Sequence, residues 1–408
     1  MGEEALVMAM SKSDDRAARW AWLREQTPVL RSLAFMNCGW SGPISRPVAQ
    51  AMQQRLDEEL QLGPATHGRM GEARQALAGR LRVAGASLLG VDVDEVAITP
   101  NTTEGMNIGI LGLDLGPDDR VVTSSGEHAG GILPAYHLRR RRGVDLEIVP
   151  IAASDTAQAV IDRFDAAIDE RTRMVALSEI SFSTGQVLPL EAIVDLAHAR
   201  GALVVGDGAQ TAGQSPLALQ AMGIDAYAVT GHKWLCGPDG MGLLYVRRDR
   251  IEAFEPAKVS FGAARSFDYV GAYEPERESI LKFEVSTVSG ALLAGTLRAV
   301  ELYLESGAEA VWDRVRELNR YAQVRFEPIS GLRVVSPQDD ATRSGLFLFT
   351  VADHAPQQVT EFLEREGRVV GRTALQGNAT RLSLHVYNTE AEIDRAAEAV
   401  ERLVATGG

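Results

Sequence analysis

Short runs rich in β-branched residues alternate with segments of helical periodicity along residues 70–250 of the chain. This alternation is typical of α/β proteins with a mainly parallel sheet, because helices connect its successive strands. The expected strands cover residues 96–99, 120–123, 146–150, 174–178, 202–206, 226–230 and 242–246. The expected helices between them cover residues 73–89, 103–111, 133–142, 157–168 and 190–200. In such sheets ligands bind beyond the strand ends, where polar or glycine-containing turns follow.

The pattern changes at about residue 290. Long amphipathic segments are followed by short strands and further helices. The helices are expected at 289–304, 311–326, 356–366 and 390–404, and the strands at 332–335, 345–350 and 380–385. We therefore expect a large sheet domain (31–288) and a connecting helix with a small α+β domain (289–408). A helical N-terminal segment (1–30) is expected to pack on the small domain.

The charge balance limits the classes of partner. Asp and Glu number 55 against 41 Lys and Arg, a net charge of −14, which disfavours nucleic acid or an anionic membrane surface as the main partner. Cys38 and Cys236 are the only cysteines, as in proteins of a reducing compartment. The sequence contains no apolar run of about 18 residues, and its first residues lack a signal-peptide pattern. The expected location is the cytoplasm, and no metal site is predicted.

Lys233 is one of only four lysines in the chain. It lies just after the expected strand 226–230, in the turn T-G-H-K-W, and a glycine-rich return follows it. A turn of this kind fixes an amine between backbone and hydroxyl groups, as an imine-forming lysine requires. A solvated lysine in a surface turn is the alternative.

Asp207 ends another apolar strand, in the segment D-G-A-Q, 26 residues before Lys233. A carboxylate at this place suits a cationic partner such as a protonated pyridine nitrogen. A metal ligand or a capped strand end would fit the residue equally well.

In combination these motifs resemble the pyridoxal phosphate (PLP) enzymes of the class V aminotransferase, or cysteine desulfurase-like, family. The D-G-A-Q, T-G-H-K-W and R-L-S-x-x-x-Y-N-T motifs occur in the family's order, and the resemblance runs from about residue 35 to the C-terminus. It implies the fold type I architecture: a large, mainly parallel seven-stranded sheet domain, a smaller α+β C-terminal domain and a homodimer.

The resemblance also implies which residues hold the cofactor ring. Lys233 would bind PLP covalently and later move the α-proton, and Asp207 would keep the ring nitrogen protonated. Gln210 would bond the ring oxygen and His128 would stack on the ring face, although a structural histidine is the alternative. Ser183 stands where the family usually has an asparagine near the ring oxygen.

The phosphate requires N–H and hydroxyl donors at the start of a helix. Thr102 and Thr103 open the expected helix 103–111, and an ordinary helix N-cap is compatible with that role. Thr230 and His232 match the family's other phosphate contacts. Thr287, in the segment F-E-V-S-T, resembles the threonine that reaches the phosphate of the neighbouring subunit.

Arginine binds a substrate carboxylate with its planar fork. Arg381 occupies the family's carboxylate-binding position, and Arg372 has a counterpart in the cysteine/cystine C–S lyases. The loop of residues 37–42 adds Asn37 and Trp40 as candidate substrate contacts. Trp40 either lines the substrate pocket or packs against the small domain.

Neither cysteine resembles the family's mobile persulfide-forming cysteine, so the sequence favours a C–S lyase over a desulfurase. The expected reaction is β-elimination from an S-substituted L-cysteine, with a role in natural-product (antibiotic) biosynthesis, where similar enzymes process cysteine S-conjugates. Decarboxylation-coupled oxidative deamination, epimerisation and transamination are alternatives on the same scaffold. A PLP-binding regulator without catalysis is a further alternative, although no DNA-binding module is apparent.

Overall fold

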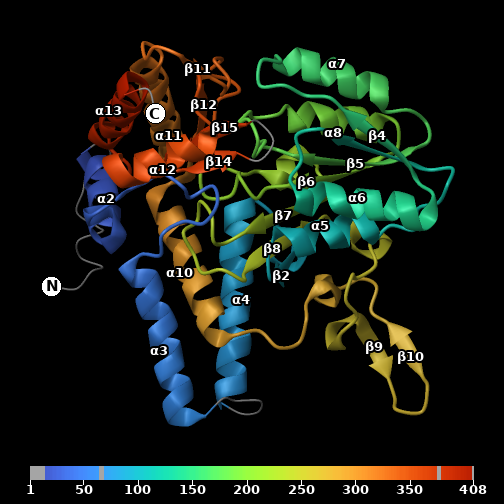
Figure 1. The fold of residues 1–408 in the computed structure, drawn as a ribbon. Coiled ribbons are helices and arrows are strands. Elements are labelled where there is room, and N and C mark those ends of the chain that lie inside the picture. Colours follow the sequence, from blue (N-terminus) through green and yellow to red (C-terminus); the bar gives the residue numbers. More distant parts are fainter. Residues whose placement is uncertain (1–13, 64–68, 375–377, 407–408) are drawn as a thin grey trace.

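The computed structural model describes residues 14–63, 69–374 and 378–406. Within these ranges the main sheet has seven strands in the order β2-β8-β7-β6-β5-β3-β4 (Figure 1). The strands are β2 (Val96–Thr99), β3 (Arg120–Ser124), β4 (Asp145–Val149), β5 (Thr172–Ser178), β6 (Leu203–Asp207), β7 (Ala226–Thr230) and β8 (Gly242–Val246). Strand β8 is antiparallel to β2 and β7, and the other neighbours are parallel. The predicted mainly parallel α/β sheet is confirmed.

Helices cover both faces of this sheet. They are α4 (Arg69–Leu89), α5 (Thr102–Leu111), α6 (Ala129–Arg142), α7 (Ala157–Ala167), α8 (Leu190–Ala199) and α9 (Leu219–Met222). Val204 and Val205 are adjacent on β6, yet they belong to separate apolar clusters, one shared with α7 and α8 and the other with α5 and α6. This is the period of two of a strand that is buried on both faces. No helix in the described ranges has both the length and the apolar character needed to cross a membrane.

The C-terminal part forms a second, four-stranded sheet of order β11-β12-β15-β14. Its strands are β11 (Leu332–Val334), β12 (Leu346–Val351), β14 (Arg372–Ala374) and β15 (Ala379–Ser383). The accompanying helices are α10 (Gly290–Ser306), α11 (Ala308–Phe326), α12 (Pro356–Gly367) and α13 (Glu390–Thr406). A separate apolar cluster lies between α11, α12 and α13 and the second sheet.

The N-terminal part contacts the C-terminal part. Helix α2 (Asp14–Glu25) holds Arg19, which donates to Leu302 O on α10, and Arg24, which donates to Tyr387 O and Glu392. Two short strands, β1 (Ala34–Phe35) and β13 (Val369–Val370), form a parallel pair. Residues 1–13 of the expected N-terminal segment lie outside the described residues. We retain as a proposal the division into residues 1–30, 31–288 and 289–408.

Several further elements were not predicted from the sequence. Helix α3 (Arg46–Leu62) packs against α10, and the strands β9 (Ala264–Phe267) and β10 (Tyr273–Pro275) form an antiparallel hairpin. The hairpin extends away from the main sheet (Figure 1). The 3-10 helices are η1 (Pro28–Arg31), η2 (Val93–Glu95), η3 (Arg248–Ala253), η4 (Phe261–Ala263) and η5 (Ile280–Phe283).

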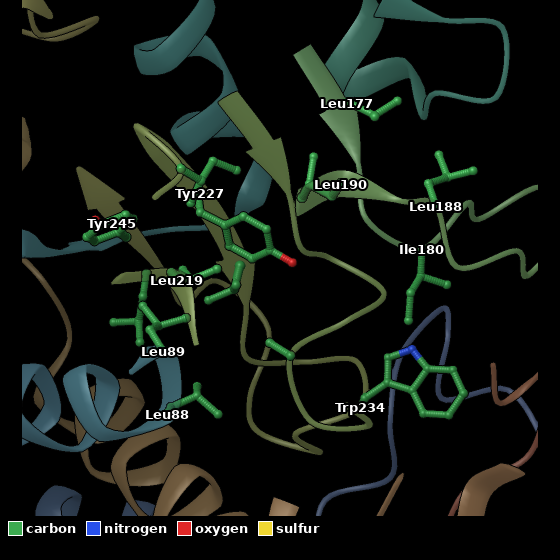
Figure 2. Close-up of a cluster of buried hydrophobic side chains, with 14 of the residues drawn as sticks. Leu88, Leu89, Leu177, Ile180, Leu188, Leu190, Leu219, Tyr227, Trp234 and Tyr245 are labelled. Carbon is green, nitrogen blue, oxygen red and sulfur yellow. The ribbon is translucent and has the colours of Figure 1, made fainter. Parts of the chain in front are cut away.

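The turn that holds Lys233 is anchored in the core by its next residue. Trp234 is 1% exposed and belongs to the same apolar cluster as Ile180 and Leu188 (Figure 2). Burial of an indole contributes several kcal/mol, by the usual ~25 cal/mol per Å² of apolar surface. Its ring N–H donates to Gln210 Oε1 at 2.9 Å, so the turn is fixed against the D-G-A-Q segment. The lysine is thus held by packing and by hydrogen bonding.

Candidate active site

A cavity of about 510 Å³ lies beyond the carboxyl ends of the main-sheet strands, between that sheet and β14 and β15. Predicted site residues gather around it from segments far apart in the sequence. These lining residues are Trp40, Thr102, Thr103, His128, Asp207, Gln210, Thr230, His232, Lys233, Arg372 and Arg381. The structure therefore brings eleven of the fourteen predicted residues to one cavity, all within the described part of the chain.

Lys233 and Asp207 reach the cavity from neighbouring strand ends. The pKa of Lys233 is lowered to about 8, mainly by burial; the Asp207 charge acts in the opposite direction, and the Arg381 and Arg372 guanidinium groups also lower it. A substantial fraction of the amine is therefore neutral near pH 8, as attack on an aldehyde requires. Asp207 is 5% exposed, and its Oδ1 accepts a hydrogen bond from Ala209 N at 2.9 Å. The carboxylate is thus held at the carboxyl end of the central strand β6.

His128 and Gln210 flank the same space. His128 is the N-cap of α6, where its Nδ1 accepts a hydrogen bond from Gly130 N at 3.0 Å. Its ring makes an edge contact with Phe182, and burial followed by the Lys233 charge lowers its pKa. Gln210 Nε2 donates to Gly39 O at 2.9 Å. Since an amide nitrogen carries two N–H groups, one donor remains for a ligand.

Hydroxyl groups gather at the start of α5. Thr102 Oγ1 is buried without a hydrogen-bond partner in the described structure, at the first residue of the helix. Thr230 Oγ1 lies 2.7 Å from His232 Nδ1. A helix start with an unpaired hydroxyl favours an anion such as phosphate. A lysine, an acid and an anion cradle in one cavity fit the aldehyde, ring nitrogen and phosphate of PLP.

Two arginines form the opposite wall. Arg372 and Arg381 are directly opposite each other on the antiparallel strands β14 and β15. Arg381 is 2% exposed; its Nη1 donates to Phe182 O at 3.1 Å, whereas Nε and Nη2 have no partner among the described residues. Burial, and then the Arg372 charge, lower its pKa to about 9. Two adjacent cations with unused donors can bind an anion such as a carboxylate.

The remaining predicted residues lie outside the cavity lining. Ser183 is buried with its Oγ 3.0 Å from Ser181 Oγ, and its neighbour Phe182 lines the cavity instead. Asn37 Oδ1 is buried without a partner in the described part of the chain. Thr287 is exposed between η5 and α10. Trp40, in contrast, stacks on Arg372, whose Cζ lies 3.7 Å from the ring centroid.

Sequence reasoning missed several lining residues. They are Gly39, Ser41, Asn101, Phe182, Ala209, Asp239 and Ala374. All except Asp239 and Ala374 lie in or beside segments that were identified from the sequence. The segments were therefore recognised, although these residues within them were not. Glu127, a buried acid directly before His128, was also missed.

Comparison with known proteins agrees with this geometry. The sequence model of the family described as Aminotransferase class-V matches residues 41–396. The chain belongs to this family. A probable cysteine desulfurase from Halalkalibacterium halodurans is 31% identical over 325 residues, which cover 76% of this chain and 77% of that protein. One from Aeropyrum pernix is 30% identical over 94% of this chain and 98% of its own.

Solved structures of the class V family share the fold. The complex of the cystine C–S lyase C-DES with its product cysteine persulfide has a TM-score of 0.86 at 28% identity, covering 92% of this chain and 99% of that one. A lysine variant of C-DES, with glycine linked covalently to the PLP cofactor, has a TM-score of 0.85 at 28% identity over 93% and 98% of the two chains. The predicted family, fold type I architecture, PLP cofactor and PLP-dependent C–S lyase class are confirmed.

Proposed function

We propose that the protein cleaves an S-substituted L-cysteine by β-elimination and releases a thiol, pyruvate and ammonia. The observation that carries this choice over persulfide transfer is the state of the chain's two thiols. Cys38 is fully buried, and burial raises its pKa well above the usual value. Burial raises the pKa of Cys236 to about 12. Sulfur transfer requires a thiolate nucleophile, and neither cysteine supplies one near neutral pH.

The cavity residues divide the work of this reaction. Bound PLP supplies an electron sink for the electron pair released at Cα. Arg381 holds the substrate carboxylate, Asp207 holds the ring-nitrogen end by charge, and Lys233 Nζ takes the α-proton. The electrons of the C–S bond leave with sulfur as a thiolate, which is then protonated. The aminoacrylate left behind takes up water and gives pyruvate and ammonia.

The substrate end of the cavity supports a substituent larger than hydrogen on sulfur. Trp40 lines the cavity and is 55% exposed, so this wall borders solvent. Its stacking on Arg372 makes a planar surface beside the carboxylate site. A cysteine S-conjugate of specialised metabolism fits such a wall better than free cysteine does.

A direct test is incubation with cysteine S-conjugates followed by product analysis. We expect thiol and pyruvate in equal amounts, with no need for an oxo acid. Aldehyde and carbon dioxide would replace this proposal with decarboxylation-coupled oxidative deamination. Turnover that requires an oxo acid indicates transamination, and exchange of the α-proton without thiol release indicates epimerisation. Absence of any turnover across the conjugates would favour a regulator.

We further propose that the working unit is a homodimer in which Thr287 completes the site of the second subunit. Thr287 does not line the cavity of its own chain. The adjacent Ser286 donates to Ser260, which precedes η4 and the β9–β10 hairpin. This surface exposes apolar side chains, including Phe261 (74%) and Tyr269 (96%), and contiguous apolar exposure is typical of an interface.

Mixing two inactive variants tests the placement of Thr287. Chains carrying Lys233→Ala and chains carrying Thr287→Ala are unfolded together and refolded as mixed dimers. If Thr287 acts across the interface, each mixed dimer has one intact site, and ~one quarter of all sites recover in a random mixture. Unmixed variants refolded in parallel are the control. Recovery no greater than the sum of those controls would place Thr287 outside the partner's site.

A further inference from the structure

Glu127 is a buried acid for which the proposed reaction has no role. It lies between β3 and α6, directly before His128, and is 2% exposed. Its carboxyl accepts hydrogen bonds from the hydroxyl groups of Ser124 and Ser178 and from Ser178 N at 2.9 Å. A carboxyl held by three donors on two strands has one fixed orientation.

The Glu127 carboxyl lies close to that of Asp207. Ser178, which Glu127 contacts, is the register partner of Asp207 on the parallel strands β5 and β6. A β-carbon placed on Gly131 would lie 3.6 Å from Asp207 Oδ2 and 3.9 Å from Glu127 Oε2. Both carboxyl groups therefore have an oxygen within 4 Å of the same point beside α6. They lie at the end of the cavity where Asp207 would hold the ring nitrogen of bound PLP.

The charged and neutral forms of the Glu127 carboxyl are both populated near neutral pH. Its pKa is raised to about 7, mainly by burial; the Asp207 charge also raises it, and the hydrogen bonds from Ser124 and Ser178 act in the opposite direction. The other titratable or charged groups around the two acids and the cavity come from the ends of β3 and β5, from β7 and the turn after it, and from β14 and β15. They are His128, Glu179, Tyr227, His232, Lys233, Asp239, Arg372 and Arg381.

We propose that Glu127 is a positioning residue that acts on PLP through its neighbours. As the second acid behind Asp207, it adds negative charge at the ring-nitrogen end of the cofactor. As the residue before His128, it fixes the N-cap of α6 and thereby the imidazole that lines the cavity. The proposal needs no substrate, so it stands or falls independently of the bond that the enzyme breaks.

The test is a pH titration of the visible absorption band of the holoenzyme, which reports a proton on the link between Lys233 and the cofactor. A nearby anion stabilises that protonated link. Glu127→Gln keeps the size of the side chain but removes its charge; its amide oxygen can still accept from Ser178, and its amide nitrogen can donate to the Ser124 hydroxyl oxygen. We expect the midpoint to fall by roughly half to one pH unit. In Ser178→Ala the acid loses a hydroxyl donor that lowers its pKa, so a smaller fraction of Glu127 is charged and we expect a midpoint between those of the wild type and Glu127→Gln.

Glu179→Gln is the matched control. Glu179 is a neighbouring acid that accepts a hydrogen bond from Tyr227, and burial raises its pKa to about 7 as well. We expect it to leave the midpoint unchanged. An unchanged midpoint in Glu127→Gln, or an equal shift in Glu179→Gln, would overturn the proposal. Circular dichroism shows whether Glu127→Gln is folded, and if it is not, an unchanged midpoint in Ser178→Ala overturns the proposal.

Discussion

Lys233→Ala is expected to abolish the visible absorption band of the purified protein and to lower turnover of cysteine S-conjugates by roughly 10⁴-fold or more. The substitution removes both the amine that bonds the cofactor aldehyde and the base that takes the α-proton. Burial lowers the pKa of Lys233 to about 8, so no exposed lysine of ordinary pKa is an equivalent replacement. Absorption spectra and initial rates measured on the same preparation check both effects.

Lys258→Ala is the matched control for this variant. Lys258 is also one of the four lysines, but it lies on the surface, where its Nζ pairs with Glu104 at 2.7 Å. Surface ion pairs contribute little to stability, so we expect an unchanged spectrum and rate. A Lys233→Ala protein that stays yellow and active would contradict the assignment of the cofactor lysine.

Arg381→Lys is expected to lower kcat/KM by about 10²-fold, and Arg381→Met by about 10³-fold. Lysine retains a charge but lacks the two parallel donors that match a carboxylate, and methionine has neither. In the described part of the chain, Nε and Nη2 of Arg381 are buried and have no hydrogen-bond partner. Water therefore does not replace the contact that Arg381 makes with the substrate carboxylate. Steady-state kinetics with one S-conjugate measure the effect.

Substitution of Arg381 is expected to raise the stability of the protein although it lowers activity. A buried cation without a carboxylate partner is costly, so Arg381→Met should raise the Tm of the protein by about 2–4 °C while activity falls. Arg343→Lys is the control, since Arg343 is also buried (6% exposed) but does not line the cavity. It should leave kcat/KM unchanged. A loss of activity in Arg381→Met accompanied by a lower Tm would indicate a structural role instead.

The sequence was sufficient to predict the central sheet. Runs such as Val204 and Val205 are apolar on both faces, and this pattern distinguishes a strand in a two-sided parallel sheet. It was insufficient for β14, because three residues pair with β15 without a pattern of their own. Helix α3 is rich in polar residues, and its packing on α10 could not be read from periodicity.

The site shows the same division between local pattern and long-range contact. Motifs predicted Lys233 and Asp207 because their chemistry follows from short segments at strand ends. The stacking of Trp40 on Arg372 joins residues more than 300 positions apart, and no local pattern encodes it. Glu127 was missed because one of its partners, Ser178, is on β5, far from it in the sequence. The site residues could therefore be predicted from the sequence, whereas the residues that they contact could be identified only from the folded structure.

The central claim is that PLP is bound through Lys233, and borohydride reduction of the holoenzyme tests it most directly. Reduction makes the cofactor link permanent, and peptide mass spectrometry then locates it among the four lysines Lys12, Lys233, Lys258 and Lys282. We predict one cofactor mass per chain, on the peptide that contains Lys233. A label on another lysine, or a reconstituted protein that takes up no label, would contradict the account.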